Sequence, residues 1–268
     1  MYSGNGFKSR PPAVADQFYP ADATQLAVLL QQMMDAAKPS ANYQVKAIIV
    51  PHAGYVYSGP VAASAYQAIK HRANEVSRVV LMGPSHRVGF HGIATPSAIE
   101  YSMPFGAVKV DRAAISLLST LPQVQQLDQA HQLEHSLEVQ LPFLQSVLDS
   151  FTLVPLVVGE CTANQVAEVL ELLWDGDETL IVISSDLSHY HSYETAREMD
   201  RRTSDAILNL SPEDIHYADA CGRNPVNGLL LAARHHKLKP SLIDLRNSGD
   251  TAGTRDRVVG YGAYLFCS

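Results

Sequence analysis

Cysteine is scarce in this sequence, and its scarcity limits what kind of protein the chain can be. Three cysteines, Cys161, Cys221 and Cys267, stand far apart and are odd in number. Such usage argues against a disulfide framework and is typical of a reducing compartment. Because the first ten residues also lack the apolar core of a signal peptide, we expect a cytoplasmic protein with free thiols.

Long apolar runs and an excess of positive charge are missing as well. No run approaches the length of a transmembrane helix. The 27 acidic residues outnumber the 20 lysines and arginines, which gives a formal net charge of -7. A chain of this charge has no basic footprint for phosphate backbones or anionic lipids, so we expect neither a nucleic-acid partner nor a membrane partner.

Two glycine-containing signatures of large enzyme classes are absent too. The sequence has no phosphate-binding loop of the P-loop or dinucleotide type, and no GxSxG elbow around a nucleophilic serine. These absences argue against the corresponding nucleotide-binding and hydrolase classes. A hydrolase that pairs Cys221 with a histidine stays open, because such partners meet in space and not in sequence.

Apolar β-branched runs that alternate with helical periodicity make up most of the chain. With 46% hydrophobic and 18% charged residues, the chain can bury a substantial core. After an irregular lead-in over residues 1–20, the main predicted strands are 45–50, 79–82, 151–158, 179–184, 241–246 and 258–266. The predicted helices are 22–38, 60–70, 111–120, 133–150, 162–174, 193–209, 211–218 and 224–234. This alternation predicts one α/β domain over residues 1–268, a layered α/β/α sandwich with a central parallel or mixed sheet.

The rest of the chain is organised around residues 48–60. An apolar run ends at Pro51, and His52 follows at once, just beyond the carboxyl end of the predicted strand. Ser58 is expected to cap a helix that begins near Pro60. Open α/β sheets bind ligands at the carboxyl ends of their strands, so His52 is a candidate site residue.

Two further strands end in the same way. One ends at His86, and another is followed by Asp186 and His189. Two neutral imidazoles from neighbouring strand ends can bind zinc, iron or copper, although His52 and His86 could equally be loop histidines paired with backbone carbonyls.

Asp186 and His189 are three residues apart, so a helical turn would place them on one side. There they could supply a metal ligand, or a general base with its orienting carboxylate. The alternative is that Asp186 caps the following turn and His189 packs against Tyr190.

Cys221 stands just before a predicted helix whose N-cap is Asn224, with Arg223 between them. The helix end and the guanidinium would favour a thiolate, which is a nucleophile and a soft metal ligand. The alternative is a small buried residue.

His135 and Glu138 share a predicted helical face, as do Glu134 and Glu138. They do not form an HExxH zinc motif, because no second histidine follows at the required place. These three residues could support metal ligands, or they could lie on a solvated helix face with salt bridges.

Taken in order, these motifs resemble the Memo family, whose prokaryotic members are called AmmeMemoRadiSam system protein B. The resemblance runs from about residue 10 to the C-terminus. It is carried by Pro51-His52-Ala53-Gly54-Tyr55, Gly83-Pro84-Ser85-His86, Glu134-His135-Ser136-Leu137-Glu138, Ser184-Ser185-Asp186-Leu187-Ser188-His189 and Cys221-Gly222-Arg223.

The resemblance implies a fold similar to the catalytic subunit of class III extradiol dioxygenases, which are non-haem iron(II) enzymes. It implies that His52 and His86 are metal ligands and that Cys221 is the third, where the dioxygenases use a carboxylate. His189 would occupy the place of their acid/base histidine, with Asp186 beside it as its partner or a further ligand. Iron(II) is the expected metal, with copper or zinc as alternatives.

The thiolate is the main departure from the dioxygenases. A thiolate makes the site softer and places an oxidisable sulfur beside any bound oxygen. The resemblance therefore does not imply that this protein cleaves aromatic rings. The residues expected to line or support the pocket are Tyr55, Tyr57, Ser85, Glu134, His135, Glu138, Tyr190 and Arg223.

We therefore predict metal-dependent redox or dioxygenase-like chemistry on a small molecule. One alternative is a non-catalytic adaptor that holds a peptide or partner protein in the same cleft, since eukaryotic Memo proteins are linked to signalling. Another is a metal-free or zinc-dependent hydrolase. The family name further implies a functional association with a radical SAM protein.

Overall fold

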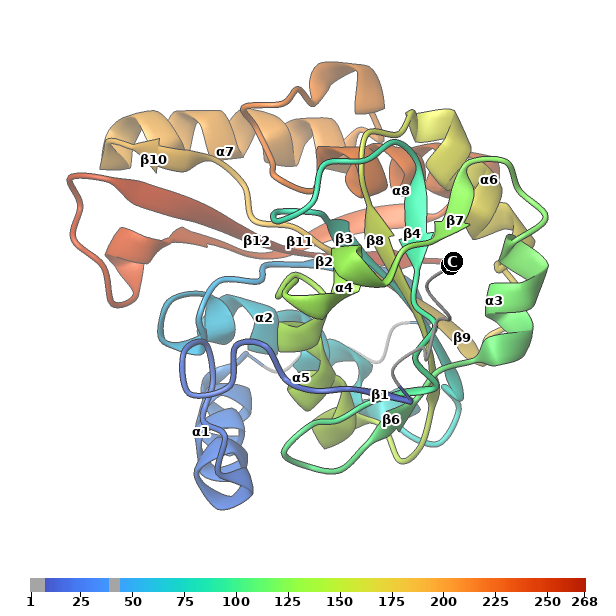
Figure 1. Cartoon of the computed structure of the whole chain (residues 1–268). Coiled ribbons are helices and arrows are strands. Elements are labelled where there is room, and N and C mark those ends of the chain that lie inside the picture. The colour runs from blue at the N-terminus through green and yellow to red at the C-terminus, as the bar shows by residue number, and fades with distance from the viewer. Residues whose placement is uncertain (1–7, 39–43) are drawn as a thin grey trace.

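The computed structural model describes residues 8–38 and 44–268, so the first seven residues of the predicted lead-in lie outside it (Figure 1). A nine-stranded mixed sheet runs through the centre in the order β10-β12-β2-β9-β3-β8-β4-β7, with β11 paired to β12. Its strands are β2 (Val45–Val50), β3 (Arg78–Pro84), β4 (Ile93–Thr95), β7 (Val124–Gln126), β8 (Thr152–Val158), β9 (Thr179–Ser184), β10 (His189–His191), β11 (Lys239–Asn247) and β12 (Val258–Cys267). A small separate sheet contains β1 (Ser9–Arg10), β5 (Glu100–Tyr101) and β6 (Val108–Lys109).

Helices cover both faces of the large sheet (Figure 1). One face carries α1 (Ala23–Ala36), α2 (Tyr55–Ile69) and α5 (Leu141–Val147), and the other carries α6 (Ala163–Leu172), α7 (Tyr193–Leu208) and α8 (Arg223–His235). The short helices α3 (Arg112–Leu118) and α4 (Asp128–Gln132) contact β8 and β4. The predicted layered α/β/α sandwich with a mixed sheet is confirmed. Within the described ranges, no helix is long and apolar enough to cross a bilayer.

The centre of the sheet is parallel, and this arrangement fixes where the site must lie. Every residue of β2 and β9 is buried, because helices cover both faces of these strands. Val50 of β2 pairs with Ser184 of β9, and Pro84 of β3 pairs with Val158 of β8. Because β3 and β9 are also parallel, the carboxyl ends of four neighbouring strands meet at one edge of the sheet.

Several predicted elements have different bounds in the structure. The helix after His52 begins at Tyr55 with Gly54 as its N-cap, so the predicted Ser58 cap is wrong. The Ser58 hydroxyl instead donates to the carbonyl of Ala53 at 2.8 Å. Pro60 lies inside the helix and does not begin it.

Other differences concern chain segments around the site. The chain after β9 is not helical, because residues 189–191 form strand β10 at the edge of β12. The helix predicted over 211–218 is a single 3-10 turn, Pro212–Asp214. The helix predicted over 133–150 is split into a loop, a 3-10 turn at Glu138–Gln140, and α5 with a proline in its first turn.

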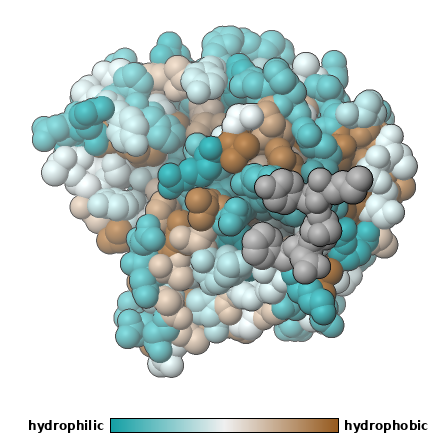
Figure 2. All heavy atoms as spheres, in the orientation of Figure 1, coloured by the Kyte–Doolittle hydropathy of each residue, from teal (hydrophilic) through white to brown (hydrophobic). Residues whose placement is uncertain are grey.

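The face of the molecule in Figure 2 is mostly hydrophilic, with scattered apolar patches. This agrees with the acidic, mixed composition of the chain.

Candidate metal centre

His52 lies directly beyond β2 and is 1% exposed. Its Nδ1 is 2.9 Å from the Ser184 hydroxyl at the end of β9, and its backbone N–H donates to Asp186 Oδ1 at 2.7 Å. Burial, followed by the nearby histidines, lowers the pKa of His52 well below its ordinary value. A neutral imidazole with Nδ1 engaged leaves Nε2 unprotonated and able to bind a metal ion, as in metal-binding histidines.

His86 lies beyond β3, and Glu134 fixes its orientation. The carboxylate of Glu134 accepts from the His86 backbone N–H at 2.6 Å and lies 2.9 Å from His86 Nδ1. The same carboxylate accepts the backbone N–H groups of His135 and Ser136, each at 2.9 Å. Burial alone would raise the pKa of Glu134, but these hydrogen bonds and His86 hold it at about 2. Glu134 is therefore an ionised carboxylate that leaves His86 Nε2 free.

The His135 ring contacts the rings of both candidate ligands, His52 and His86, although we expected His135 only to support them. Its ring stacks on His86 at 4.6 Å between centroids and meets His52 edge-on at 5.5 Å. One ring nitrogen from each of the three histidines lies within 4.8 Å of the others, so together they could hold an ion. His135 Nδ1 is buried, lies 3.3 Å from Glu134 Oε1 and forms no hydrogen bond with the part of the chain that the structure describes. Burial lowers the pKa of His135 to about 4.

Cys221 lies beside His52 although 169 positions separate them in the sequence. Its Sγ is 3.3 Å from His52 Nε2. The helix that follows starts at Arg223 with Gly222 as N-cap, and not at the predicted Asn224. The expectation of a favoured thiolate is wrong for the protein alone, because burial and the carboxylate of Asp186 raise the thiol pKa far above its ordinary value.

Asp186 and His189 do not share a helical turn, because the chain between them is not helical and His189 begins strand β10. Asp186 is 4% exposed and lies under His52, with Oδ2 4.0 Å from His52 Nε2. Burial raises the pKa of Asp186, and the backbone N–H of His52 opposes that shift. His189 belongs to β10 and lines the neighbouring pocket, where its ring lies 5.8 Å from that of Tyr190.

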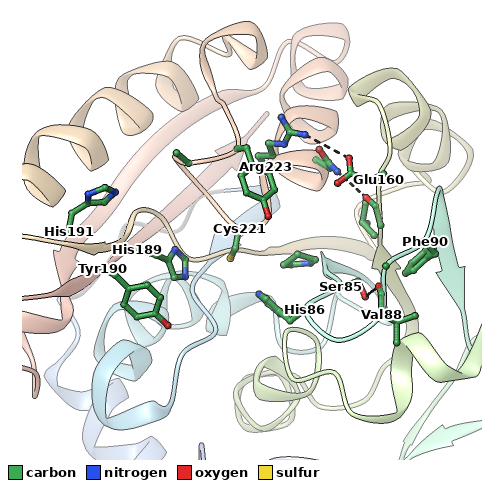
Figure 3. Close-up of a pocket in the computed structure, with 17 residues that line it drawn as sticks. Ser85, His86, Val88, Phe90, Glu160, His189, Tyr190, His191, Cys221 and Arg223 are labelled. Atoms are coloured by element: carbon green, nitrogen blue, oxygen red, sulfur yellow. Dashed lines mark hydrogen bonds and ion pairs between the residues drawn. The ribbon is translucent and has the colours of Figure 1, made fainter.

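A pocket of about 560 Å³ opens beside these residues (Figure 3). Cys221 and His86 point into its centre, and His189 faces them from the other side. Its walls also include Ser85, Phe90, Glu160, Tyr190, Tyr217, Arg223 and Asn224. This volume suits a small molecule.

The remaining predicted residues divide into two groups. Ser85, Tyr190 and Arg223 line the pocket, and the Arg223 guanidinium turns toward Glu160 and away from Cys221 (Figure 3). Tyr55 and Tyr57 do not line it.

Tyr55 is buried and its hydroxyl donates to the Val139 carbonyl at 2.7 Å. Glu138 is not brought to the pocket either. Its carboxylate forms an ion pair with Arg10 and accepts the Tyr19 hydroxyl at 2.6 Å.

Several residues that hold or line the site were not predicted from the sequence. Ser184 and Gln140 form a hydrogen-bonded pair at 2.8 Å behind His52. A polar serine at the end of an otherwise apolar strand was a usable signal for Ser184. Tyr217 and Asn224 also line the pocket, and no local pattern marked them.

The fold and the site together define an α/β protein with a candidate transition-metal centre at the carboxyl ends of its parallel strands. The chain belongs to the Memo family, because the family model described as Memo-like protein matches residues 10–265. The predicted resemblance is therefore confirmed, and with it the class III extradiol dioxygenase-like fold of that family.

Individual relatives agree with this assignment. A MEMO1 family protein of Ignicoccus hospitalis is 36% identical, with 96% of this chain and 98% of that protein covered. One from Methanosarcina mazei is 34% identical, with the same shares covered. The crystal structure of the uncharacterized protein JW3007 from Escherichia coli K12 aligns with a TM-score of 0.48 and 12% identity, over 81% of this chain and 99% of that chain. This last similarity is too weak to inform the fold or the function.

Proposed function

We propose that the protein binds a transition-metal ion through His52, His86 and Cys221 and uses it for redox chemistry on a small molecule. Iron(II) is the metal we propose first, with copper or zinc as alternatives. One observation carries the proposal. A buried histidine and a half-buried thiol from distant parts of the chain lie 3.3 Å apart, and the thiol lines a pocket together with a second histidine, His86.

Two of the proposed donor atoms, Cys221 Sγ and His52 Nε2, have the separation of ligands of one ion. Among the described residues, the group around His52 whose ligand atoms all lie within 4.8 Å of one another is His52, His86 and His135. In a tetrahedral site, a thiolate sulfur and an imidazole nitrogen lie about 3.6 Å apart, close to the distance between Cys221 Sγ and His52 Nε2. Ser184 and Glu134 engage the Nδ1 atoms of His52 and His86, as supporting residues of metal sites do. Because burial raises the thiol pKa of Cys221, binding through this residue must release the thiol proton, and the bound cation would then supply the positive charge that the thiolate needs.

When bound, the metal would supply one-electron or oxygen chemistry that no side chain here can provide. The residues of the chain have other tasks. The pocket binds the substrate, and the faces of Tyr190 and Tyr217 can hold a planar group. His189 lies in the pocket wall and is the proposed acid/base group. Asp186 lies under His52 and positions it through the backbone N–H.

His135 provides a competing set of ligands, because its ring belongs to the three-histidine cluster. The third ligand would then be a nitrogen and not a sulfur. Cobalt(II) distinguishes the two sets, because a thiolate ligand adds an intense sulfur-to-metal charge-transfer band in the near ultraviolet.

The test begins with metal analysis by mass spectrometry on protein purified anaerobically without a histidine tag. Near-stoichiometric iron or copper in the wild type, lost in His86→Ala, is the expected result. The cobalt(II)-loaded protein should show the charge-transfer band, which Cys221→Ser should remove and His135→Asn should retain.

Retention of the band in Cys221→Ser would reject the cysteine as a ligand. Absence of metal from every folded preparation, together with no binding of added iron, copper or zinc, would reject the metal centre. In that case the same pocket would be a binding site for a peptide or partner protein.

A further inference from the structure

A second group of metal-ligating side chains lies outside the site already described. Glu171, near the end of α6, lies between two histidines at the end of α8. Its Oε1 is 2.9 Å from His235 Nδ1, and its Oε2 is 2.8 Å from His236 Nε2. One donor atom from each of the three lies within 4.8 Å of the others.

We propose that Glu171, His235 and His236 form a second transition-metal site, which links the C-terminal ends of α6 and α8. Two imidazole nitrogens and one carboxylate form a donor set of intermediate softness, suited to Zn²⁺, Ni²⁺ or Cu²⁺. This inference does not rest on the proposed function of the pocket.

The two helices bring these residues together without flexible loops. α6 and α8 pack side by side on one face of the sheet (Figure 1). The middle of α8 approaches α6 closely, since a Cβ on Gly228 would lie 2.2 Å from the Val166 side chain. Two helices in parallel contact bring their C-terminal ends to the same place, where the partial negative charge of each helix favours a cation.

His236 is fixed in orientation by its neighbours. Its ring stacks on Trp174 at 3.8 Å between centroids and 7° between planes. The helix terminates directly after it, with the Leu238 N–H donating to the Ala233 carbonyl at 2.9 Å and Lys237 in the left-handed region at a φ of 56°. A ring held in this way needs little ordering to bind an ion.

Metal binding would replace two hydrogen bonds with coordination bonds. Without metal, each ring nitrogen that faces Glu171 carries a proton. To bind the ion, a neutral imidazole moves that proton to its other ring nitrogen, so only the tautomer changes. His235 is largely exposed, so further positions on the ion would be open to water.

The single tryptophan of the chain makes this site observable by itself. Trp174 is in stacking contact with His236, so a paramagnetic ion bound there would quench its fluorescence. The other candidate centre lies beyond the opposite end of α8, whose 13 residues span about 20 Å. An ion there would be a much weaker quencher.

The experiment is a titration of the tag-free, metal-free protein with Ni²⁺, followed through tryptophan emission. We expect saturable quenching, with emission restored by excess Zn²⁺, which binds the same donors but has no unpaired electrons. Glu171→Gln and His235→Gln should shift the quenching midpoint to higher Ni²⁺ by on the order of 10-fold to 100-fold. His86→Ala is the matched control for the other centre and should leave the midpoint unchanged.

Three results would overturn the proposal. They are a wild-type emission that does not saturate, unchanged midpoints in Glu171→Gln and His235→Gln, or a loss of quenching in His86→Ala. His235 is on the surface, so its substitution leaves the packing of the helices intact and the comparison stays valid.

Discussion

Replacing Glu134 by glutamine should weaken both the fold and the metal centre. The two side chains have nearly the same shape, so the change removes charge and one acceptor without creating a cavity. In the native protein, Glu134 Oε2 accepts the His86 backbone N–H. Glu134 Oε1 faces His86 Nδ1 and accepts the backbone N–H groups of His135 and Ser136. Whichever way the amide is oriented, its NH₂ group would face at least one buried donor.

The size of the effect follows from the pKa of the carboxylate. Glu134 has its pKa lowered from 4.5 to about 2, a difference that corresponds to about 3 kcal/mol of folding free energy at neutral pH. The native pKa is depressed, so this contribution is present above 4.5 and is lost as the pH falls from 4.5 toward 2. We expect Glu134→Gln to lower the free energy of unfolding at pH 7 by about 2–4 kcal/mol, including one unsatisfied N–H.

Metal affinity should fall together with stability. Without the carboxylate, His86 loses the partner that fixes its ring and favours a free Nε2. Substitution of such supporting residues costs on the order of 10-fold to 100-fold in metal affinity. Urea unfolding of the metal-free protein at several pH values, and competition of the protein with a chelator for Zn²⁺, measure the two effects separately.

Glu160→Gln is the matched control. Glu160 is also a pocket carboxylate, but it is largely exposed and lies 3.9 Å from its nearest charged partner, Arg223. Its substitution should change stability by less than about 0.5 kcal/mol. A Glu134→Gln variant as stable as this control at pH 7, or one whose stability between pH 4.5 and 2 follows the wild-type curve, would contradict the role given to the Glu134 carboxylate.

Two further predictions concern buried groups away from the metal centre. Glu138→Gln should lower the free energy of unfolding in urea by about 3–5 kcal/mol, because it leaves the buried Arg10 guanidinium without its anion. Adding Arg10→Met should recover part of that loss, and equal losses in the single and double variants would contradict this prediction. His131 has its pKa lowered by burial from 6.5 to about 4, so between these values the unfolded chain binds that proton and the folded chain does not. His131 should therefore contribute a loss of up to about 3 kcal/mol of stability on acidification from pH 6.5 to 4, in addition to the losses that the lowered pKa values of His52 and His135 cause in the same range. His131→Gln should flatten this part of the pH profile, and an unchanged slope would show that His131 does not cause it.

Much of the fold and part of the candidate site could be predicted from local patterns. Apolar runs such as Val45–Val50 identified the central strands, since strands buried on both faces cannot tolerate polar residues. The same runs placed His52 and His86 at strand ends, and parallel pairing then brought the two rings to 5.1 Å. The start of α2 was missed because Pro60 is favourable at a helix start, whereas buried packing of Tyr55 extends the helix earlier.

The sequence by itself determined the alternation of strands and helices, the strand ends that carry histidines, and the family. These follow from periodicity and motif order, which are properties of neighbouring residues in the chain. The tertiary structure alone decided which side chains meet. It placed Cys221 against His52, turned Glu138 to Arg10, added His135 to the cluster, and joined Glu171 to the end of α8. It also reversed the expected acidity of the Cys221 thiol, because burial and a neighbouring carboxylate outweigh the helix end that the sequence shows. Such contacts depend on strand register and helix packing between residues that lie from tens of positions to more than a hundred apart in the chain, and no local pattern contains that information.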